Sequence, residues 1–371
     1  MKILVTGGAG FVGSHLVDRL VGQGHDVRVL DNLDPQVHGG ERKPPPYFNQ
    51  CAELIVGDVR NRECVATALE GIEVLFHQAA AVGVGQSMYE IEHYVSVNGI
   101  GSAVVLEEVI KRKDRIKRIV IASSMSIYGE GAYLDSKNEV VYPSLRDDEK
   151  MASQKFECLD AEGKPLSPIP TNESKPLRPT SVYAVTKRDQ EELFLTVGSA
   201  YDIPTVALRY FNIYGTRQAL SNPYTGVMAI FSARLLNRKS PIIFEDGRQT
   251  RDFVNVRDIV EANLCAMKTD RGIGKAFNIG TGKPTSILEV ADTLSSQLDF
   301  PDPPEIMGKY RTGDIRHCFA DINNARKDLG FQPNVELADG LRELLAWLRR
   351  QRPEDRVEQA TSELVQRGLT R

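Results

Sequence analysis

The chain has 371 residues, 26% of them charged, and a formal net charge of −4, a length that allows one large domain or two fused lobes with a sizeable core. Acidic and basic residues are balanced along most of the sequence and the five cysteines are scattered, which argues against a nucleic-acid-binding surface, a disulfide framework and a zinc site. No apolar run approaches the roughly 20 residues of a membrane helix, and a strand pattern begins at the second residue, so we expect a cytoplasmic protein without a signal peptide, a membrane contact or a bound metal.

The N-terminal half alternates short apolar runs with helical patterns. Residues 2–6 are apolar, residues 12–23 have helical periodicity and residues 26–31 form a second apolar run, which predicts a βαβ unit. The later runs are continuously apolar rather than alternating, which is typical of a parallel sheet covered by helices on both faces. The sequence therefore predicts an α/β, doubly wound parallel sheet, with further strands at 54–57, 73–76, 118–122 and 205–209 and helices near 62–70, 96–112 and 182–200.

The C-terminal part has a less regular pattern, with shorter apolar runs and more Pro and Gly after about residue 210. We expect a sheet domain at 1–210, a smaller mixed α/β lobe at 211–350, with some crossing of the chain between them, and a charged amphipathic tail at 351–371 after Pro353. Residues 34–48 and the insertion 130–176 contain Pro, Gly and charge without periodicity, which predicts long loops. The predicted helices of the lobe lie near 226–237, 255–268, 286–297 and 336–350.

A glycine-rich turn joins the first predicted strand to the first helix. Gly7 permits a tight turn, Gly10 lets the backbone approach a pyrophosphate, and Gly13 allows close packing of the helix. Phe11 and Val12 open that helix, whose free amide groups and positive dipole suit a phosphate. Between a strand and a helix, this spacing predicts a Rossmann-type dinucleotide site.

Polar residues at two strand ends indicate which dinucleotide binds. Asp31 closes the second strand, where a carboxylate can accept hydrogen bonds from the adenosine ribose and would repel a 2′-phosphate, so NAD is favoured over NADP. Asn32 follows it. Asp58 and Val59, after the third strand, are assigned to the adenine edge; the alternative for Asp58 is a simple cap of the strand end.

Tyr183 and Lys187 form a Tyr-x-x-x-Lys pair. Four residues are about one helical turn, so on a helix the phenol and the ammonium point the same way. Lys187 and the positive nicotinamide of oxidised cofactor would then lower the pKa of Tyr183 and make it a general base. We expect Lys187 to bond the nicotinamide ribose and Ser124 to relay the proton of the reacting sugar oxygen. The alternative is an ordinary surface helix, which the glycine turn and Ser124 argue against.

The glycine spacing, the Ala79-Ala80-Ala81 segment and the serine, tyrosine and lysine together resemble the extended short-chain dehydrogenase/reductase superfamily over about residues 1–350. Residues 123–129 (SSMSIYG) and 209–215 (RYFNIYG) resemble its nucleotide-sugar epimerase and dehydratase branch. The resemblance implies that Ala79, Ala80, Ala81 and Asn98 line the pocket of bound NAD. It also implies a homodimer formed through the helices at 96–112 and 182–200.

The residues after Ser124 bear on the reaction class. Nucleotide-sugar 4,6-dehydratases carry an Asp-Glu pair there, whereas this chain has Met125 and Ser126, which cannot supply that acid–base chemistry. The resemblance therefore implies a hexose 4-epimerase, in which Tyr183 removes the 4-hydroxyl proton, hydride passes to NAD⁺, the 4-ketosugar turns and hydride returns to its opposite face. The alternatives are a nucleotide-sugar 4-ketoreductase or dehydrogenase and a non-catalytic NAD-sensing protein, which would need none of the three catalytic residues.

The resemblance also implies a nucleoside-diphosphate sugar, dTDP- or UDP-linked, as substrate. For the two arginines assigned to the diphosphate, Arg251 and Arg311, the alternative role is a structural ion pair with a nearby carboxylate. The segment 129–183 is longer than the corresponding segment of typical hexose 4-epimerases. Val82 stands where many of these enzymes have a lysine near the cofactor phosphates. The insertion and the segments 217–218 and 314–317 resemble dTDP-L-rhamnose 4-epimerases, which make dTDP-6-deoxy-L-talose; UDP-hexoses come next. The residues assigned to the substrate are Ser124 and Ser126 for the sugar, Asn212, Arg251 and Arg311 for the diphosphate, whose oxygens suit arginine forks, and Asp314 for the nucleoside ribose.

Overall fold

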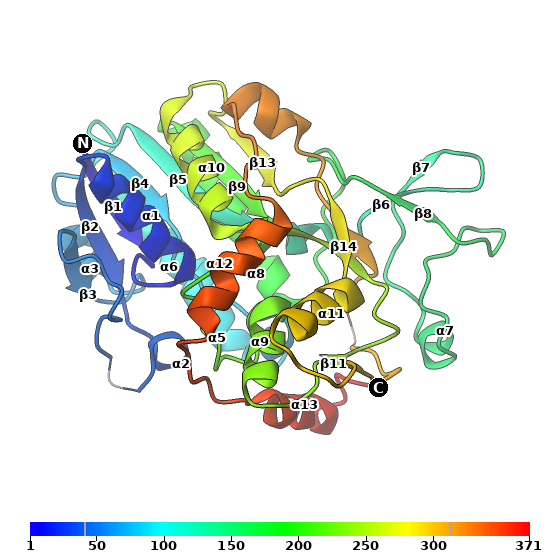
Figure 1. Ribbon diagram of the computed structural model, residues 1–371. Coiled ribbons are helices and arrows are strands. Elements are labelled where there is room, and N and C mark those ends of the chain that lie inside the picture. The colour runs from blue at the N-terminus through cyan, green and yellow to red at the C-terminus, as the bar shows by residue number, and fades with distance from the viewer. Residues whose placement is uncertain (41, 312) are drawn as a thin grey trace.

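A computed structural model describes residues 1–40, 42–311 and 313–371 (Figure 1). Its centre is a seven-stranded sheet in which all neighbouring strands run parallel, in the order β13-β9-β5-β4-β1-β2-β3. The order reverses direction between β1 and β4, and ligands of such sheets bind beyond the carboxyl ends of the strands at this point. The predicted doubly wound α/β sheet is confirmed, with β1 (Lys2–Thr6), β2 (Asp26–Asp31), β3 (Glu53–Val56), β4 (Val74–His77), β5 (Arg118–Ser124), β9 (Thr205–Tyr210) and β13 (Lys275–Ile279).

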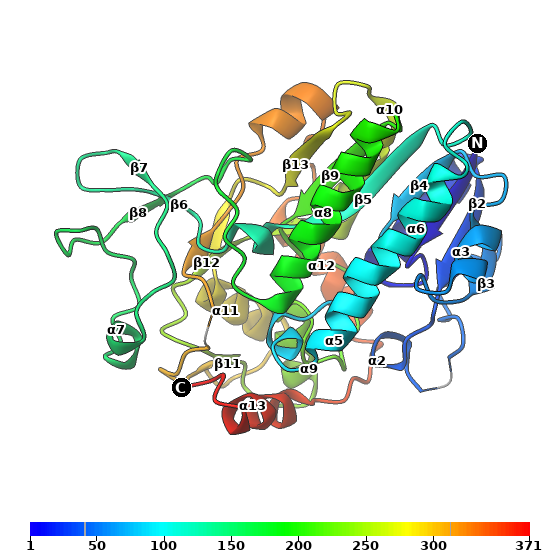
Figure 2. The ribbon, with the colours of Figure 1, turned by 180° about the vertical axis from the view of Figure 1, so that it is seen from behind.

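Helices cover both faces of this sheet. On one face Leu16 and Ile259 pack with strand residues such as Val5, and on the other Val105 and Phe194 pack in a second core. Figure 2 shows α6 and α8 side by side on the second face. The first face carries α1 (Phe11–Gly22) and α10 (Val256–Lys268), and the second carries α3 (Arg62–Ala68), the π-helical turn η1 (Val95–Ile100), α6 (Gly101–Ile110) and α8 (Val182–Ala200).

Helix α10 lies elsewhere than the sequence suggested. The pattern at 255–268 was expected to belong to the smaller lobe, but α10 packs against α1 and the sheet. Because β9 and β13 are parallel neighbours, the chain must return across one face of the sheet between them, and α10 is this return. The chain therefore leaves the sheet after β9, builds part of the lobe and comes back.

The smaller lobe has its own core, formed largely by three helices with buried side chains such as Phe231, Leu294 and Leu344. A four-stranded sheet lies beside it with β12 at its centre. The elements are α9 (Val227–Leu236), α11 (Ile287–Gln297), α12 (Leu337–Leu348), β10 (Asn212–Tyr214), β12 (Thr250–Asn255), β14 (Pro284–Ser286), β16 (His317–Cys318), the pair β11 (Ile242–Ile243) and β15 (Glu305–Ile306), the π-helical η3 (Ala325–Leu329) and the tail helix α13 (Val357–Gln366).

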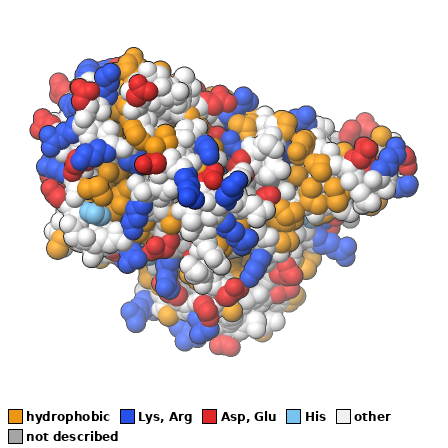
Figure 3. All heavy atoms as spheres, turned by 90° about the horizontal axis from the view of Figure 1, so that it is seen from above, with side chains coloured by type: hydrophobic (Ala, Val, Ile, Leu, Met, Phe, Trp, Pro, Cys, Tyr) orange, Lys and Arg blue, Asp and Glu red, His pale blue; other side chains and the backbone are white. Residues whose placement is uncertain are grey.

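The insertion at 130–176 is more ordered than a loop. It contains an antiparallel three-stranded sheet and a short helix, and it projects from the body of the molecule (Figures 1 and 3). Its strands have only two or three residues each, too few to show a periodicity in the sequence. Its elements are β6 (Ala132–Leu134), β7 (Val140–Val141), β8 (Ser167–Ile169) and α7 (Asp148–Ala152).

Short helical segments surround the carboxyl edge of the main sheet. They are α2 (Pro35–His38), α4 (Val84–Ser87), α5 (Ile91–Tyr94) and the 3₁₀ turn η2 (Met125–Tyr128). Figure 3 shows acidic and basic side chains intermingled over the face in view. In the described part of the chain, every helix is too short or too polar to cross a bilayer.

Candidate active site

The glycine turn lies at the carboxyl end of β1 and fits tightly against its surroundings. Gly7 has φ +68°, and a Cβ atom there would lie 2.8 Å from the Cα atom of Ala79. A Cβ atom on Gly13 would lie 2.1 Å from the carbonyl oxygen of Gly7, so a side chain at either position would displace the backbone. Gly10 caps α1 without a side-chain hydrogen bond. The first amide groups of the helix, at Phe11 and Val12, can therefore meet a pyrophosphate.

Asp31 lies at the end of β2, beside this turn. Its carboxylate accepts hydrogen bonds from the backbone amides of Ala9 at 3.0 Å and Leu33 at 2.9 Å, and His38 Nε2 lies 3.6 Å away. Asp31 therefore also holds the glycine turn against β2, a role that sequence reasoning missed because the amide donors carry no residue-type signal. Its bond to the adenosine ribose stays a prediction.

Asp58 lies beyond β3 and is tied to its neighbours. Arg60 donates to both carboxylate oxygens, at 2.9 and 2.7 Å, and its amide donates to the same group. The hydrogen bond from the Arg60 side chain is the main reason that the pKa of Asp58 lies below its usual value. The nearby Asn32 Nδ2 is 3.5 Å away. These contacts match the alternative of a strand-end cap, so the contact of Asp58 and Val59 with adenine stays a prediction.

The alanine segment after β4 is clamped by Asn98. The Ala81 amide donates to Asn98 Oδ1 at 2.8 Å, and Asn98 Nδ2 donates to the Ala81 carbonyl oxygen at 3.1 Å. The Ala79 amide donates to the Thr6 hydroxyl at 3.3 Å. Asn98 is fully buried and lies in the π-helical turn η1, a feature frequent at functional sites. Asn98 therefore holds the predicted cofactor segment in shape from within the protein, and its contact with the cofactor, like that of Ala80, stays a prediction.

Ser124, Tyr183 and Lys187 come together at the carboxyl edge of the sheet. Ser124 is the last residue of β5, and α8, which carries the other two, packs against β5. The start of α8 is fixed by two serines, because the Ser181 hydroxyl accepts from the Ala184 amide at 3.1 Å and the Ser87 hydroxyl from the Tyr183 amide at 3.0 Å. Both side chains belong to one helix, as the Tyr-x-x-x-Lys spacing predicts, and their catalytic roles stay predictions.

The electrostatics of the tyrosine differ from the simple prediction. In the protein alone, burial raises the pKa of Tyr183, and a hydrogen bond with Ser124 opposes the rise. The Lys187 ammonium donates instead to the carbonyl oxygen of Ala122 and to Gln190 Oε1. Burial lowers the pKa of Lys187 to about 7, although the carboxylate of Glu191 opposes this. The expected lowering of the Tyr183 pKa therefore requires the positive nicotinamide of bound NAD⁺ as well as the lysine.

Ser126 follows Ser124 in the 3₁₀ turn η2. Its hydroxyl donates to Ser124 Oγ at 2.9 Å, and its amide donates to the same atom at 3.2 Å. Ser124 therefore receives two hydrogen bonds, which leaves its own proton free for Tyr183 or for a substrate oxygen. The turn η2, with residues Met125, Ser126, Ile127 and Tyr128, carries no carboxylate, and the buried Tyr128 hydroxyl donates to Asn278 Oδ1.

The predicted substrate residues fall into two groups. Asn212 Oδ1 is buried and has no hydrogen-bond partner among the described residues, a costly state that a ligand can relieve. Arg311 stacks on Phe244 at 4.2 Å and is 41% exposed, 4.0 Å from Asp314. Arg251, by contrast, donates to Asp314 at 3.3 Å and to three backbone carbonyl oxygens. The contacts of Arg251 match the alternative of a structural ion pair, and its bond to a phosphate stays a prediction.

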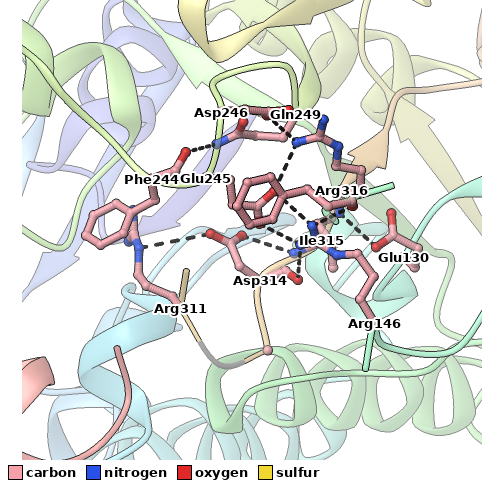
Figure 4. A network of polar contacts seen from close by, with 12 residues as sticks. Glu130, Arg146, Phe244, Glu245, Asp246, Gln249, Arg311, Asp314, Ile315 and Arg316 are labelled. Carbon is pink, nitrogen blue, oxygen red and sulfur yellow. Dashed lines mark hydrogen bonds and ion pairs between the residues drawn. The ribbon is translucent and has the colours of Figure 1, made fainter. Parts of the chain in front are cut away.

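A buried charge network lies behind Arg311 and Asp314 (Figure 4). Arg316 is fully buried and pairs with Glu157, Glu245 and Asp246, while Arg146 forks onto Glu245 at 2.8 and 2.7 Å. Glu157 and Arg146 belong to the insertion, so the network joins the insertion to the segment that carries the predicted substrate residues. No local pattern in the sequence predicts this network, because its paired residues are separated by 70 to 159 positions along the chain.

A parallel sheet with a glycine turn, and a serine, tyrosine and lysine converging beyond its strands, define a dinucleotide-dependent enzyme of the extended short-chain dehydrogenase/reductase type. The model of the NAD dependent epimerase/dehydratase family matches residues 3–156 and 160–280. The chain belongs to this family, and its cofactor is NAD.

Relatives and solved structures agree with this assignment over nearly the whole chain. The dTDP-L-rhamnose 4-epimerase of Burkholderia thailandensis is 34% identical over 94% of both chains. A putative UDP-glucose 4-epimerase of Methanocaldococcus jannaschii is 34% identical over 94% of this chain and 98% of its own. The UDP-glucose 4-epimerase of Thermotoga maritima, solved with UDP-glucose, has a TM-score of 0.76 and 31% identity, covering 94% of this chain and 99% of that one.

Proposed function

We propose that the protein is a nucleotide-sugar 4-epimerase that interconverts dTDP-L-rhamnose and dTDP-6-deoxy-L-talose. The observation that carries the reaction type is the convergence of Ser124 with Tyr183 and Lys187 where Met125 and Ser126 replace the acid–base pair of dehydratases. Without that pair, reversible oxidation of one carbon is the chemistry that these side chains support.

In this mechanism Tyr183 takes the proton of the sugar 4-hydroxyl and later returns it. When bound beside these residues, NAD⁺ would supply reversible hydride transfer at carbon 4 of the sugar. Ser124 holds the sugar oxygen beside the phenol through the hydrogen-bonding capacity described above. Lys187 contributes positive charge that favours the phenolate and a donor for the nicotinamide ribose. The glycine turn, with Asp31 beside it, holds the other end of the cofactor.

Inversion at carbon 4 requires the ketosugar to turn while the nucleotide end stays fixed. We assign that anchoring to Arg311 and Asn212, with Asp314 for the nucleoside ribose. Arg311 is the exposed cation of this group, and the buried Oδ1 of Asn212 has no hydrogen-bond partner among the residues that the structure describes. The sheet domain then binds NAD and the smaller lobe binds the nucleoside diphosphate.

The dTDP-linked deoxysugar is supported by the Burkholderia relative, which is similar over 94% of both chains, and by the insertion, whose Glu157 and Arg146 contact Arg316 and Asp314. A UDP-hexose is the second candidate. The Methanocaldococcus relative is named a putative UDP-glucose 4-epimerase, and the Thermotoga enzyme was solved with UDP-glucose bound. Incubation with dTDP-L-rhamnose, UDP-glucose and UDP-galactose, with products identified by NMR, tests the choice. We expect dTDP-L-rhamnose to be converted to dTDP-6-deoxy-L-talose and the two UDP sugars to remain unchanged. Turnover of the UDP sugars alone would contradict the proposed substrate.

The same incubations distinguish the reaction class. An epimerase forms product without net change in NADH absorbance, whereas a 4-ketoreductase or dehydrogenase changes it in proportion to product. A protein that binds NAD and converts no nucleotide sugar in a wider panel would instead fit the alternative of an NAD sensor.

We further propose a homodimer formed through η1, α6 and α8. Val95, Ile100 and Val185 on these elements are 44%, 55% and 51% exposed, and α6 and α8 lie together on one face (Figure 2). Exposed apolar side chains that share a face favour association. Light scattering after gel filtration should give twice the chain mass, and a monomer mass would contradict the proposal.

A further inference from the structure

The catalytic lysine has an unusual partner one helical turn further along α8. Lys187 Nζ donates to the carbonyl oxygen of Ala122 and to the side-chain oxygen of Gln190. An ammonium has three donors, so these two partners in the described part of the chain leave one N–H for the nicotinamide ribose or the tyrosine. Lys187 is 3% exposed and Gln190 is fully buried.

The orientation of the Gln190 amide is fixed by a chain of hydrogen bonds. The Ser102 hydroxyl donates to the Asn98 carbonyl oxygen at 2.5 Å, which uses its only proton. Ser102 can then only accept from Gln190, whose Nε2 lies 2.9 Å away. Because the nitrogen of the amide faces Ser102, its oxygen must face Lys187.

The same chain reaches the cofactor segment. Asn98, whose carbonyl receives Ser102, clamps Ala81 through its side chain and also donates to the Thr186 hydroxyl at 3.0 Å. Close packing of η1 makes this possible, since a Cβ atom on Gly99 would lie 3.3 Å from Asp189 Oδ2. Lys187 and the alanine segment are therefore held by one continuous set of buried polar groups.

The other ionisable groups around Lys187 are each occupied or neutral. Glu191 on α8 pairs with Arg209 at 2.6 Å and accepts from Ser123 at 2.5 Å. His77 on β4 is buried, and that burial lowers its pKa to about 3, which keeps the ring neutral. Tyr183 lies one helical turn before the lysine on α8. A neutral amide can therefore hold the ammonium without adding a negative charge that would oppose the phenolate.

We propose that Gln190 is a positioning residue for the reaction: its carbonyl oxygen, oriented by Ser102, directs the Lys187 ammonium so that its third donor faces the nicotinamide ribose and Tyr183. This inference rests on the proposed catalytic role of Lys187. A neutral acceptor at this position stabilises the ammonium, so its removal makes Lys187 lose its proton at lower pH, whereas a carboxylate there delays that loss to higher pH.

The test compares Gln190→Met, which keeps the length of the side chain without the acceptor, with Gln190→Glu and Ser102→Ala. Glu192→Gln is the matched control, because Glu192 lies on the exposed face of the same helix and pairs with Arg188. The measurements are kcat and KM for the nucleotide sugar between roughly pH 6 and 10, and the NAD content of each purified variant.

For Gln190→Met, kcat should fall about tenfold, equivalent to about 1.4 kcal/mol, with KM and NAD content unchanged and the alkaline limb of the kcat profile moved to lower pH. Ser102→Ala should move the limb the same way by less, and Gln190→Glu should move it to higher pH. If Gln190→Glu fails to fold, the shifts of the alkaline limb in Gln190→Met and Ser102→Ala test the proposal without it. The control should match the unmodified enzyme.

Loss of activity in Gln190→Met without a shift of the limb would overturn the positioning role, since a merely structural residue lowers activity at all pH values alike. Full activity in Gln190→Met would overturn it too. The variant Lys187→Met separates the two levels of the proposal: if it stays active, the catalytic assignment of Lys187 itself fails, whereas an inactive Lys187→Met with an unshifted Gln190→Met refutes only the role of Gln190.

Discussion

Arg316 offers a test of how the insertion supports the substrate segment. Its side chain is fully buried, with Glu157, Glu245 and Asp246 at 2.5, 3.0 and 2.7 Å. The change Arg316→Met removes the charge and keeps most of the apolar stem, so the measured effect reports the ion pairs rather than a cavity.

The cost can be worked out from the partners that remain. Removing one member of a buried ion pair costs about 3–5 kcal/mol. Glu245 keeps its pair with Arg146 at 2.7 Å, and Glu157 and Asp246 are 41% and 34% exposed, so water can replace part of what is lost. The expected cost is therefore about 3 kcal/mol, which in a chain of 371 residues is a fall of about 4 °C in the thermal midpoint.

A thermal melt of the NAD-bound enzyme and the KM for the nucleotide sugar measure both consequences. Arg251 donates both to the Arg316 carbonyl oxygen and to the carboxylate of Asp314, a predicted substrate residue. A shift of Arg316 would therefore move Asp314, and KM should also rise. Arg342→Met is the control, since that side chain is 75% exposed on α12 and surface pairs contribute less than about 1 kcal/mol. A midpoint for Arg316→Met equal to that of the control would refute the reasoning.

Three further outcomes are expected. Tyr183→Phe should lower kcat by about 10²–10⁴-fold while NAD stays bound; near-normal turnover would show that another group is the base. Arg311→Met should raise KM about tenfold, as expected for a lost charge-assisted bond, without changing NAD content, and an unchanged KM would remove Arg311 from the substrate site. The pKa of Glu157 is lowered from 4.5 to about 2, first by its bond with His317, so it stabilises the fold above about pH 4.5 and less as pH falls toward 2. Glu157→Gln should flatten this part of the stability profile, and an unaltered profile would argue against the pair.

Local patterns predicted most of the fold. The apolar runs at 2–6, 118–122 and 205–209 became central strands because a parallel strand buried on both faces is continuously apolar. The helix at 182–200 was placed to the residue. The small sheet in the insertion escaped notice because its strands are so short, and α10 was put in the smaller lobe because an amphipathic stripe shows that a helix packs but not on which core it packs.

The residues of the site also fall into those that the sequence predicts and those that only the fold reveals. Tyr183, Lys187 and Ser124 could be found because spacing along one helix and position at a strand end are visible in the sequence. The partners of Arg316 and the contact of Ser102 with Gln190 could not be found, since 88 residues separate the latter pair and only the folded sheet brings them together. The direction of the Tyr183 pKa shift also depends on burial, which is a tertiary property.

Transient oxidation at carbon 4 is tested most directly by running the reaction in D₂O with the enzyme as isolated, without added cofactor, and following carbon 4 of the nucleotide sugar by NMR. Hydrogen that leaves as hydride and returns from tightly held NADH does not exchange with solvent, so the epimerised product should keep its full proton signal at carbon 4. Deuterium at that position would contradict the mechanism, because the hydrogen would then have been removed as a proton.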